Sequence, residues 1–285
     1  MNNSCKGCKL RSLCRKILLI VILAAVSLRA QPSPLELADS LTAAGFYDEA
    51  ITEYYRFAFF NPEDTLLGDV YSKIGYCYGD LESWKKALNA IDLAILVSGT
   101  DSLVTQRKID KSAILLASGE NDAAINELRN LDYADSRSIV RADNLLFLAY
   151  TLDHNWPAAL DIFRRSSISD GPNAAAIEST LVRATKIKYK SGSTASILSA
   201  IVPGAGQVYN GRYLAALNAM AINGAFGYWT VNNIINENYT SAFLVFLFFF
   251  ERYYEGNRYQ AIRQAEKHNA AIDTRLEHDI LKLIR

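Results

Sequence analysis

Apolar residues recur at steps of three and four from Pro34 to about residue 166, which is the spacing of an amphipathic α-helix. Leu37 and Leu41 mark one such stripe, and Ile74 and Tyr78 mark another one further along the chain. Each stripe is followed by a short polar or glycine-containing break and then by a second helical stripe. The pattern therefore predicts an all-α fold built from consecutive helical hairpins.

The hairpin pattern repeats at a nearly constant interval. When the four second helices are aligned, each has an alanine at the same place: Ala50, Ala87, Ala124 and Ala159, at spacings of 37, 37 and 35 residues. A small residue at a fixed position allows two helices to approach closely, whereas a large one would push them apart. We therefore expect each alanine to lie where the second helix of a hairpin crosses the first.

Other positions of the repeat have physical roles of their own. Gly45 and Gly119 are expected at the turns between helices, where a left-handed backbone conformation costs a glycine little. Pro62 is expected to end the first repeat, because proline cannot continue a helix. An aromatic residue or an asparagine follows each turn and is expected to start the second helix: Tyr47, Trp84, Asn121 and Trp156.

This pattern resembles the tetratricopeptide repeat (TPR), and the resemblance covers four repeats over residues 34–166. The first two repeats fit well, the third lacks the aromatic positions, and the fourth has neither the glycine nor a closing proline. The resemblance implies a helical-hairpin solenoid whose concave groove binds a protein or peptide. A further apolar stripe within residues 167–190 predicts a helix that caps the end of the stack.

Residues 193–254 have a different character and predict a membrane module of two to three hydrophobic segments. Tyr213–Ile235 is long enough to span a bilayer, and Ala242–Tyr254 is shorter but intensely apolar. Arginines lie at the outer ends of these two segments, so the positive-inside rule places Arg212 and Arg252 in the cytoplasm and Glu237 on the other side. A soluble, buried helical hairpin is the alternative interpretation of the same stretch.

A compact motif precedes the first long apolar segment: Pro203, Gly204, Gly206, Gln207, Tyr209 and Gly211. It is similar to the Pro-Gly-x-Gly-Gln-x-Tyr-x-Gly signature of the TM2-like and DUF5683-type families of bacterial membrane proteins. This resemblance covers about 60 residues and implies no known reaction. After the module, residues 255–285 predict an amphipathic C-terminal helix of mixed charge.

The first 30 residues predict a signal peptide or an uncleaved N-terminal anchor. They contain six basic residues and no acid, and Ile17–Leu28 is a short apolar run that ends near Ala30. Either interpretation places the repeats outside the cytoplasm. The expected location is therefore a bacterial membrane, with the repeat region on the periplasmic or extracytoplasmic side.

The charge distribution argues against nucleic acid as the main partner. Residues 31–185 hold 13 basic and 23 acidic residues, whereas binding to phosphates needs a basic face. Residues 186–285 hold 11 basic and seven acidic residues, a balance that suits contact with a lipid bilayer of anionic headgroups.

No pattern in the sequence predicts an enzyme, a cofactor or a metal. Cys5, Cys8 and Cys14 lack a nearby fourth ligand for zinc, and the glycines after Pro203 lack the Gly-Lys-Ser/Thr end of a phosphate loop. The leading hypothesis is a non-catalytic, membrane-anchored scaffold that binds a protein or peptide in its TPR groove. The alternative is a small membrane enzyme or transporter component whose polar site includes Gln207, Tyr209, Asn218 and Asn223, although amides in an apolar module also hold helices together.

Overall fold

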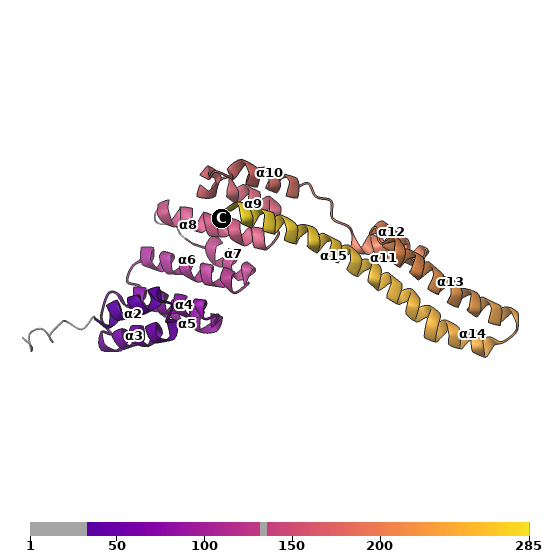
Figure 1. Cartoon of the computed structure of the whole chain (residues 1–285), viewed down its shortest axis with the longest axis horizontal. Helices are drawn as coiled ribbons and strands as arrows, with labels where there is room; N and C mark the ends of the chain where they lie inside the picture. The colour runs from indigo at the N-terminus through magenta and orange to yellow at the C-terminus, as the bar shows by residue number, and fades with distance from the viewer. Residues whose placement is uncertain (1–32, 132–135, 285) are drawn as a thin grey trace, which may run out of the picture. The chain divides into compact units, whose positions relative to one another are not determined.

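The computed structural model describes residues 33–131 and 136–284, and every regular element in these ranges is a helix (Figure 1). The all-α class predicted from the sequence is therefore confirmed. The described residues form two compact units that divide between Ile139 and Val140. The signal or anchor expected over residues 1–30, with Cys5, Cys8 and Cys14, lies outside the described residues.

The first unit consists of three consecutive helical hairpins. Its helices are α2 (Pro34–Ala43), α3 (Tyr47–Phe60), α4 (Leu67–Asp80), α5 (Trp84–Leu96), α6 (Asp101–Ala117) and α7 (Asn121–Arg129). The second helices begin at the aromatic or asparagine positions that the sequence indicates, and α3 ends at Phe60, ahead of Pro62. The hairpin order thus follows the periodicity of apolar positions.

The hairpin turns share one backbone geometry. Gly45 and Gly119 have φ values of 81° and 84°, as expected, and Glu82 and His154 occupy the equivalent positions with φ values of 54° and 57°. In each turn the next residue donates its N–H to a carbonyl five residues earlier, as in the 2.9 Å bond from Phe46 to the carbonyl of Leu41. This bond is that of the Schellman ending, in which a left-handed residue satisfies carbonyls at the end of a helix.

The four aligned alanines, Ala50, Ala87, Ala124 and Ala159, are all fully buried. In the second hairpin, the partner of the alanine on the opposite helix is Gly75. A Cβ added at Gly75 would lie 2.8 Å from the side chain of Ile91 and 3.2 Å from the carbonyl of Ala87. The small residues therefore accompany a close approach of α4 and α5.

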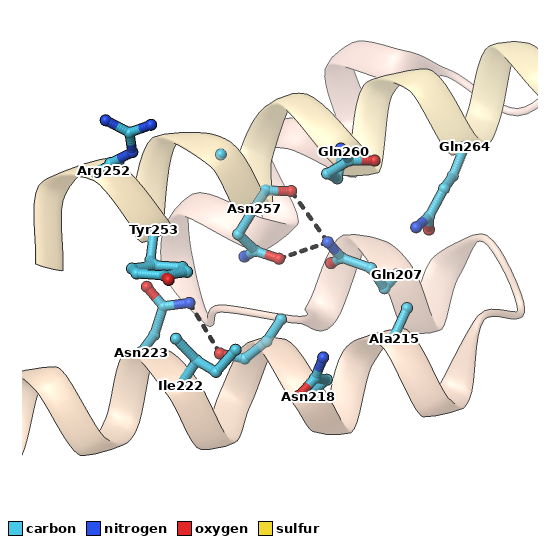
Figure 2. A pocket seen from close by; sticks show the side chains of 12 residues that line it. Gln207, Ala215, Asn218, Ile222, Asn223, Arg252, Tyr253, Asn257, Gln260 and Gln264 are labelled. Carbon is cyan, nitrogen blue, oxygen red and sulfur yellow. Dashed lines mark hydrogen bonds between the residues drawn. The ribbon is translucent and has the colours of Figure 1, made fainter. Parts of the chain in front are cut away.

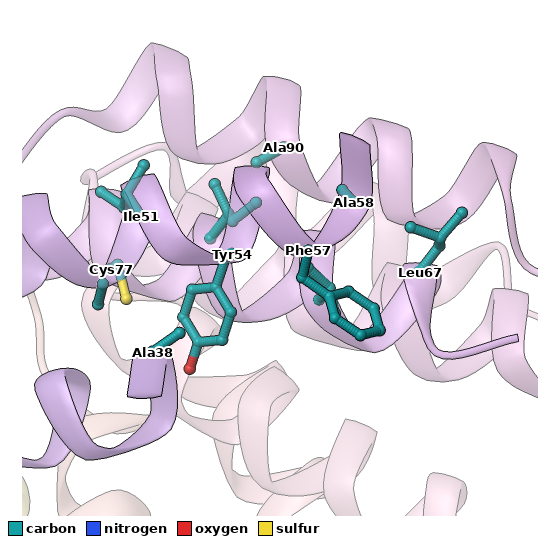
Figure 3. Close-up of a cluster of buried hydrophobic side chains, with 11 residues drawn as sticks. Ala38, Ile51, Tyr54, Phe57, Ala58, Leu67, Cys77 and Ala90 are labelled. Carbon is teal, nitrogen blue, oxygen red and sulfur yellow. The ribbon is translucent and has the colours of Figure 1, made fainter. Parts of the chain in front are cut away.

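Figure 3 shows the buried side chains that form the apolar core of the first unit. A polar network lies beside this core. Tyr54 donates its hydroxyl hydrogen bond to Asp39 at 2.6 Å, and Lys73 donates to the same carboxylate oxygen at 2.6 Å. Burial by itself raises the pKa of Asp39, but the hydrogen bonds from Lys73 and Tyr54 outweigh it and hold that pKa below its usual value. The network joins α2, α3 and α4 through one carboxylate.

The second unit begins within α8 (Ser136–Leu152), which is followed by α9 (Trp156–Phe163) and a short 3₁₀ turn, η1 (Ser167–Asp170). Helices α8 and α9 are the pair predicted as the fourth repeat. The remaining elements are α10 (Ala174–Ala184), α11 (Gly192–Ile201), α12 (Ala205–Tyr209), α13 (Tyr213–Ile235), α14 (Tyr239–Val245), a π-helical turn η2 (Phe246–Phe250) and α15 (Glu251–Ile284). Helix α13 has the bounds expected for the first long apolar segment.

Helices α13 and α14 form a hairpin, and α14, η2 and α15 follow one another as a long rod that runs back past α12 and α11 to α10 (Figure 1). Ala261 and Ala265 of α15 are fully buried against Ala195 of α11. Leu276 and Ile280 are buried near the end of the same helix. The predicted amphipathic C-terminal helix therefore packs on its own chain and begins at Glu251, a few residues earlier than the sequence indicates.

A polar cluster ties α9 to α15. Trp156 donates its indole N–H to the hydroxyl of Tyr189 at 3.0 Å and to Asp273 at 3.1 Å, and Tyr189 donates to the same carboxylate. Next to it, His154 contacts Glu277 at 2.8 Å. The aromatic position of the fourth hairpin thus contacts the C-terminal helix, a role that the repeat pattern does not indicate.

Candidate functional site

The turn between α11 and α13 is built around two glycines that no other residue can replace without strain. Gly204 has a φ of 97°, and a Cβ there would lie 2.6 Å from the carbonyl oxygen of Ala216. A Cβ at Gly206 would lie 2.0 Å from the carbonyl oxygen of Ala195 and 2.8 Å from the Cβ of Ala261. These distances are far below van der Waals contact, so α11, α12 and α15 meet at a point that has no room for a side chain.

A chain of hydrogen bonds leads from this turn to α15. The backbone N–H of Gly206 donates to Ser199 Oγ at 3.0 Å, and the Ser199 hydroxyl donates to Gln207 Oε1 at 3.1 Å. Gln207 Nε2 then donates to both the backbone carbonyl and the side-chain oxygen of Asn257 (Figure 2). The side chain of Gln207 therefore binds Asn257 of helix α15 and Ser199 of helix α11.

A cavity of about 500 Å³ opens beside this chain of bonds, between α12, α13 and the first turns of α15. We call it the amide pocket, because amide side chains predominate among its polar groups. Its lining residues are Gln207, Ala215, Asn218, Ala219, Ile222, Asn223, Arg252, Tyr253, Gly256, Asn257, Gln260 and Gln264. Arg252, which is exposed, is the one charged residue in this set, and no carboxylate lines the pocket.

Two deeply buried amides of the pocket have an atom without a hydrogen-bond partner among the described residues. Asn223 is 3% exposed and its Oδ1 is unpaired, and Asn257 is 6% exposed and its Nδ2 is unpaired. Gln264 Oε1 is a third buried atom of this kind. Because buried polar groups are nearly always paired in folded proteins, these atoms set the pocket apart from an ordinary helix crossing.

Three of the four residues proposed for a polar site from the sequence, Gln207, Asn218 and Asn223, line the amide pocket. The fourth, Tyr209, does not line it; its hydroxyl accepts a hydrogen bond from the backbone N–H of Ser191 at 3.2 Å. Pro203 and Gly211 belong to the turn, and Gly211 has a φ of 76° with open space around it.

The sequence interpretation missed the contribution of α15, which supplies half of the pocket's lining. Tyr253, Asn257, Gln260 and Gln264 are spaced by four, three and four residues, which places them on one face of a helix. A polar stripe of amides on an otherwise charged helix is the signal that could have identified this face.

Residues 188–283 match the model of DUF5683, a family of unknown function. The match covers α11 to α13, the hairpin and nearly all of α15, and therefore includes every residue that lines the amide pocket. We call residues 188–283 the DUF5683 region. No curated protein and no solved structure matches the chain.

The hairpin of the DUF5683 region exposes an unusual amount of apolar surface. On α13, Leu214 is 86% exposed and Leu217 is 65% exposed, and on α14 and η2, Phe243 and Phe248 are 61% and 60% exposed. Phe226 holds the hairpin together, with ring centroids 5.2 Å from those of Phe249 and Tyr253. Large exposed apolar patches of this kind mark surfaces that contact another molecule or a membrane.

The expectation that this hairpin spans a membrane is not supported. Within residues 33–131 and 136–284, no helix combines the length and the apolar character needed to cross a bilayer. Helix α13 is 23 residues long, but four asparagines interrupt its apolar sequence. The predicted membrane segments are therefore helices with apolar surfaces, without the composition of spanning helices.

The first unit carries a second hollow, which we call the repeat-face hollow. It has a volume of about 210 Å³ and is lined by Leu35, Leu66, Asp69, Val70, Ser72, Lys73, Tyr76 and Arg107. Apart from Leu66, which immediately precedes α4, these residues come from α2, α4 and α6, the first helices of the three hairpins. Arg107 is nearly buried and forms ion pairs with Asp69 and Asp110. The hollow thus lies on the face that successive hairpins share.

Proposed function

We propose that the protein is a non-catalytic scaffold of a bacterial envelope, which binds a protein or peptide segment on its helical repeats and associates with a lipid bilayer through the hairpin of the DUF5683 region. The observation that carries the proposal is the repeat-face hollow, to which one helix of each of three successive hairpins contributes. A surface built in this way extends with the number of repeats, which suits binding of an elongated segment.

A TPR-like architecture supports this assignment. Three consecutive hairpins share a left-handed turn residue, a Schellman bond and a fully buried alanine five residues after the turn residue. Such hairpins cannot bury their apolar faces alone, so they stack and leave one face for a ligand. In this chain that face combines an aromatic ring, Tyr76, with the charged groups of Asp69 and Lys73.

Photocrosslinking tests the proposed binding surface. Tyr76 in the hollow and Leu93 on α5 are almost equally exposed, at 41% and 40%, so they form a matched pair. A photoreactive phenylalanine at Tyr76 is expected to give a discrete crosslinked product in cells, whereas the same residue at Leu93 is expected to give none. Equal products from both positions, or no product from Tyr76, would contradict the assignment of the groove.

The apolar hairpin and the basic residues at its base support association with a bilayer. Arg212 immediately precedes α13, which carries the exposed leucines, and Arg252 and Arg258 lie in the first turns of α15, which follows the segment that carries the exposed phenylalanines. Apolar side chains that enter the headgroup region, together with nearby basic residues, bind anionic membranes without a spanning helix. The N-terminal signal pattern supports the extracytoplasmic side for the repeats.

Flotation with vesicles tests the membrane part of the proposal. Full-length protein is expected to float with phosphatidylcholine vesicles that contain phosphatidylglycerol, and the double substitution Phe243→Gln and Phe248→Gln is expected to abolish flotation. The matched control is Phe59→Gln and Phe60→Gln on α3, where the two rings are 78% and 70% exposed. Flotation that is lost equally in both variants would show that general hydrophobicity, and not the hairpin, drives the association.

A membrane enzyme or transporter component with a polar site remains the second candidate, because Gln207, Asn218 and Asn223 line one pocket. Amide side chains neither ionise nor act as nucleophiles near neutral pH, so a lining dominated by them favours binding over catalysis. Turnover that disappears on substitution of Asn223 while the protein stays folded would favour this second candidate.

A further inference from the structure

The unpaired atoms of the amide pocket define a ligand site that is separate from the repeat-face hollow. Asn223 presents a carbonyl oxygen, which can only accept a hydrogen bond, and Asn257 presents an NH₂ group, which can only donate one. Both side chains are more than nine-tenths buried and line the same cavity. The pocket therefore offers one acceptor and one donor from opposite helices, α13 and α15.

The orientation of each amide is fixed by a bond on its other side. Asn223 Nδ2 donates to the carbonyl of Ala219 at 2.8 Å, so its oxygen must face away from that carbonyl (Figure 2). Asn257 Oδ1 accepts from Gln207 Nε2, and the orientation of Gln207 is set by the backbone carbonyl of Asn257, to which Nε2 also donates at 3.0 Å. A backbone carbonyl can only accept, so the Gln207 NH₂ group must face Asn257, the Asn257 side-chain oxygen accepts from it, and the Asn257 NH₂ group is left for the pocket.

We infer that the amide pocket binds a neutral ligand that carries a carboxamide group attached to an apolar or aromatic substituent. The C=O of such a group accepts from Asn257 Nδ2, and its N–H donates to Asn223 Oδ1. Both protein groups then gain the partners that they lack, which is the kind of interaction that discriminates most strongly against analogues without the matching group.

The rest of the lining fits this class of ligand. The apolar part of the wall is formed by Ala215, Ala219 and Ile222. Tyr253 adds an aromatic wall, and its ring stacks on that of Phe226 with the ring centroids 5.2 Å apart. The volume of about 500 Å³ accommodates a ring as well as the amide. No carboxylate is among the lining residues, and the single cation, Arg252, is exposed to solvent, so the amides face a neutral group.

Ligand-observed saturation-transfer NMR on the full-length protein tests the inference with two probes of similar shape. Benzamide has the donor and the acceptor, whereas acetophenone has the same ring and the acceptor but no N–H. Benzamide is expected to bind at least about tenfold more tightly, because acetophenone leaves the buried Asn223 oxygen unpaired. Equal affinities, or no binding of benzamide up to its solubility, would overturn the inference and leave the pocket as a site for water.

The variant Asn223→Leu is expected to remove the preference for benzamide and to leave acetophenone binding within about twofold. Asn233→Leu is the matched control, because Asn233 lies on the same helix and makes the same 2.8 Å bond to the carbonyl four residues earlier, but does not line the pocket. A preference that survives in Asn223→Leu, or that is lost in Asn233→Leu as well, would contradict the assignment of Asn223. The comparison of the two probes on the unaltered protein decides the question even if Asn223→Leu does not fold.

Discussion

Substitution of Gly206 by alanine tests the central contact of the DUF5683 region most directly. The added Cβ would lie 2.0 Å from the Ala195 carbonyl oxygen, 2.5 Å from Ser199 Oγ and 2.8 Å from the Ala261 Cβ. None of these three atoms is the end of a long, flexible side chain, so α11 and α15 must both move to admit the methyl group. Such overpacking costs about 3 kcal/mol, at the upper end of the usual range for small-to-large substitutions.

The displacement has a second consequence that adds to the steric one. Ser199 Oγ accepts the Gly206 N–H and donates to Gln207, so a shift of α11 also breaks the bonds that lead to Asn257. Each bond lost in a buried site costs about 1 kcal/mol or more when a partner is left unpaired. The expected effect is therefore a local loss of structure in α11, α12 and the facing turns of α15.

Hydrogen–deuterium exchange read by mass spectrometry measures this effect in each segment separately. A destabilisation of about 3 kcal/mol accelerates exchange from locally opening segments by roughly two orders of magnitude. Peptides from α11, α12 and the start of α15 should show this acceleration, whereas peptides from α2 to α5, in the other compact unit, provide an internal reference.

Gly224 provides the matched control for this experiment. It lies in α13, and a Cβ added there meets nothing within 4 Å. Gly224→Ala is expected to slow exchange slightly, since alanine is favoured over glycine in a helix by about 1 kcal/mol. If Gly206→Ala exchanges at the same rate as the unaltered protein, the close crossing of α11, α12 and α15 does not exist, and the description of the pocket beside it fails with it.

Four further substitutions test the first unit through thermal or chemical unfolding. Glu82→Gly removes the strain of a non-glycine residue in the left-handed conformation and should stabilise the unit by about 1 kcal/mol. Gly45→Ala introduces the same strain and should destabilise the unit by about as much. Effects of the same sign would show that the two turns do not require a left-handed residue. Ala87→Leu should cost about 1–3 kcal/mol by overpacking the α4–α5 crossing, and an unchanged melting curve would show that the repeat alignment is wrong. Tyr54→Phe should cost about 1 kcal/mol at pH 7. Because the pKa of Asp39 is lowered in the folded protein, the destabilisation by Tyr54→Phe should be fully present above the unfolded pKa of aspartate, about 3.9. The destabilisation should shrink as the pH falls through the lower folded pKa of Asp39, so a destabilisation that grows toward pH 2 would contradict the network.

Local rules were sufficient to predict the hairpins of the first unit. Gly45 and Gly119 favour the left-handed turn, and the alanine five residues after each of them permits the close helix crossing. Residue type alone therefore predicts both features. The same rules did not indicate that Glu82 and His154 adopt the left-handed conformation, because this conformation is uncommon for any residue other than glycine. Their backbone is set by the helices on both sides, a tertiary effect that composition does not record.

The division of the chain was harder to predict than its helices. The periodic pattern places α8 and α9 in the repeat region, but α9 and most of α8 belong to the second unit. Trp156 of α9 donates hydrogen bonds to Tyr189 and Asp273, which are far away in sequence. A single aromatic residue at a repeat position looks the same whether it meets the next repeat or a different helix. The boundary depends on these long-range contacts.

The amide pocket shows most clearly what a sequence pattern leaves undetermined. Asn218 and Asn223 stood out because asparagine is costly in an apolar helix, and that reasoning applied to one helix alone. The same cost argument could not identify Asn257 or Gln264, which lie in a charged helix where a polar residue needs no explanation. The burial of Asn257 and of the Gln264 side-chain oxygen follows from Gly206, which lets α12 approach α15 so closely that Gln207 reaches Asn257. A glycine that sets the distance between two helices therefore determines whether amides on the second helix are solvated or buried, and only a description of both helices can distinguish the two.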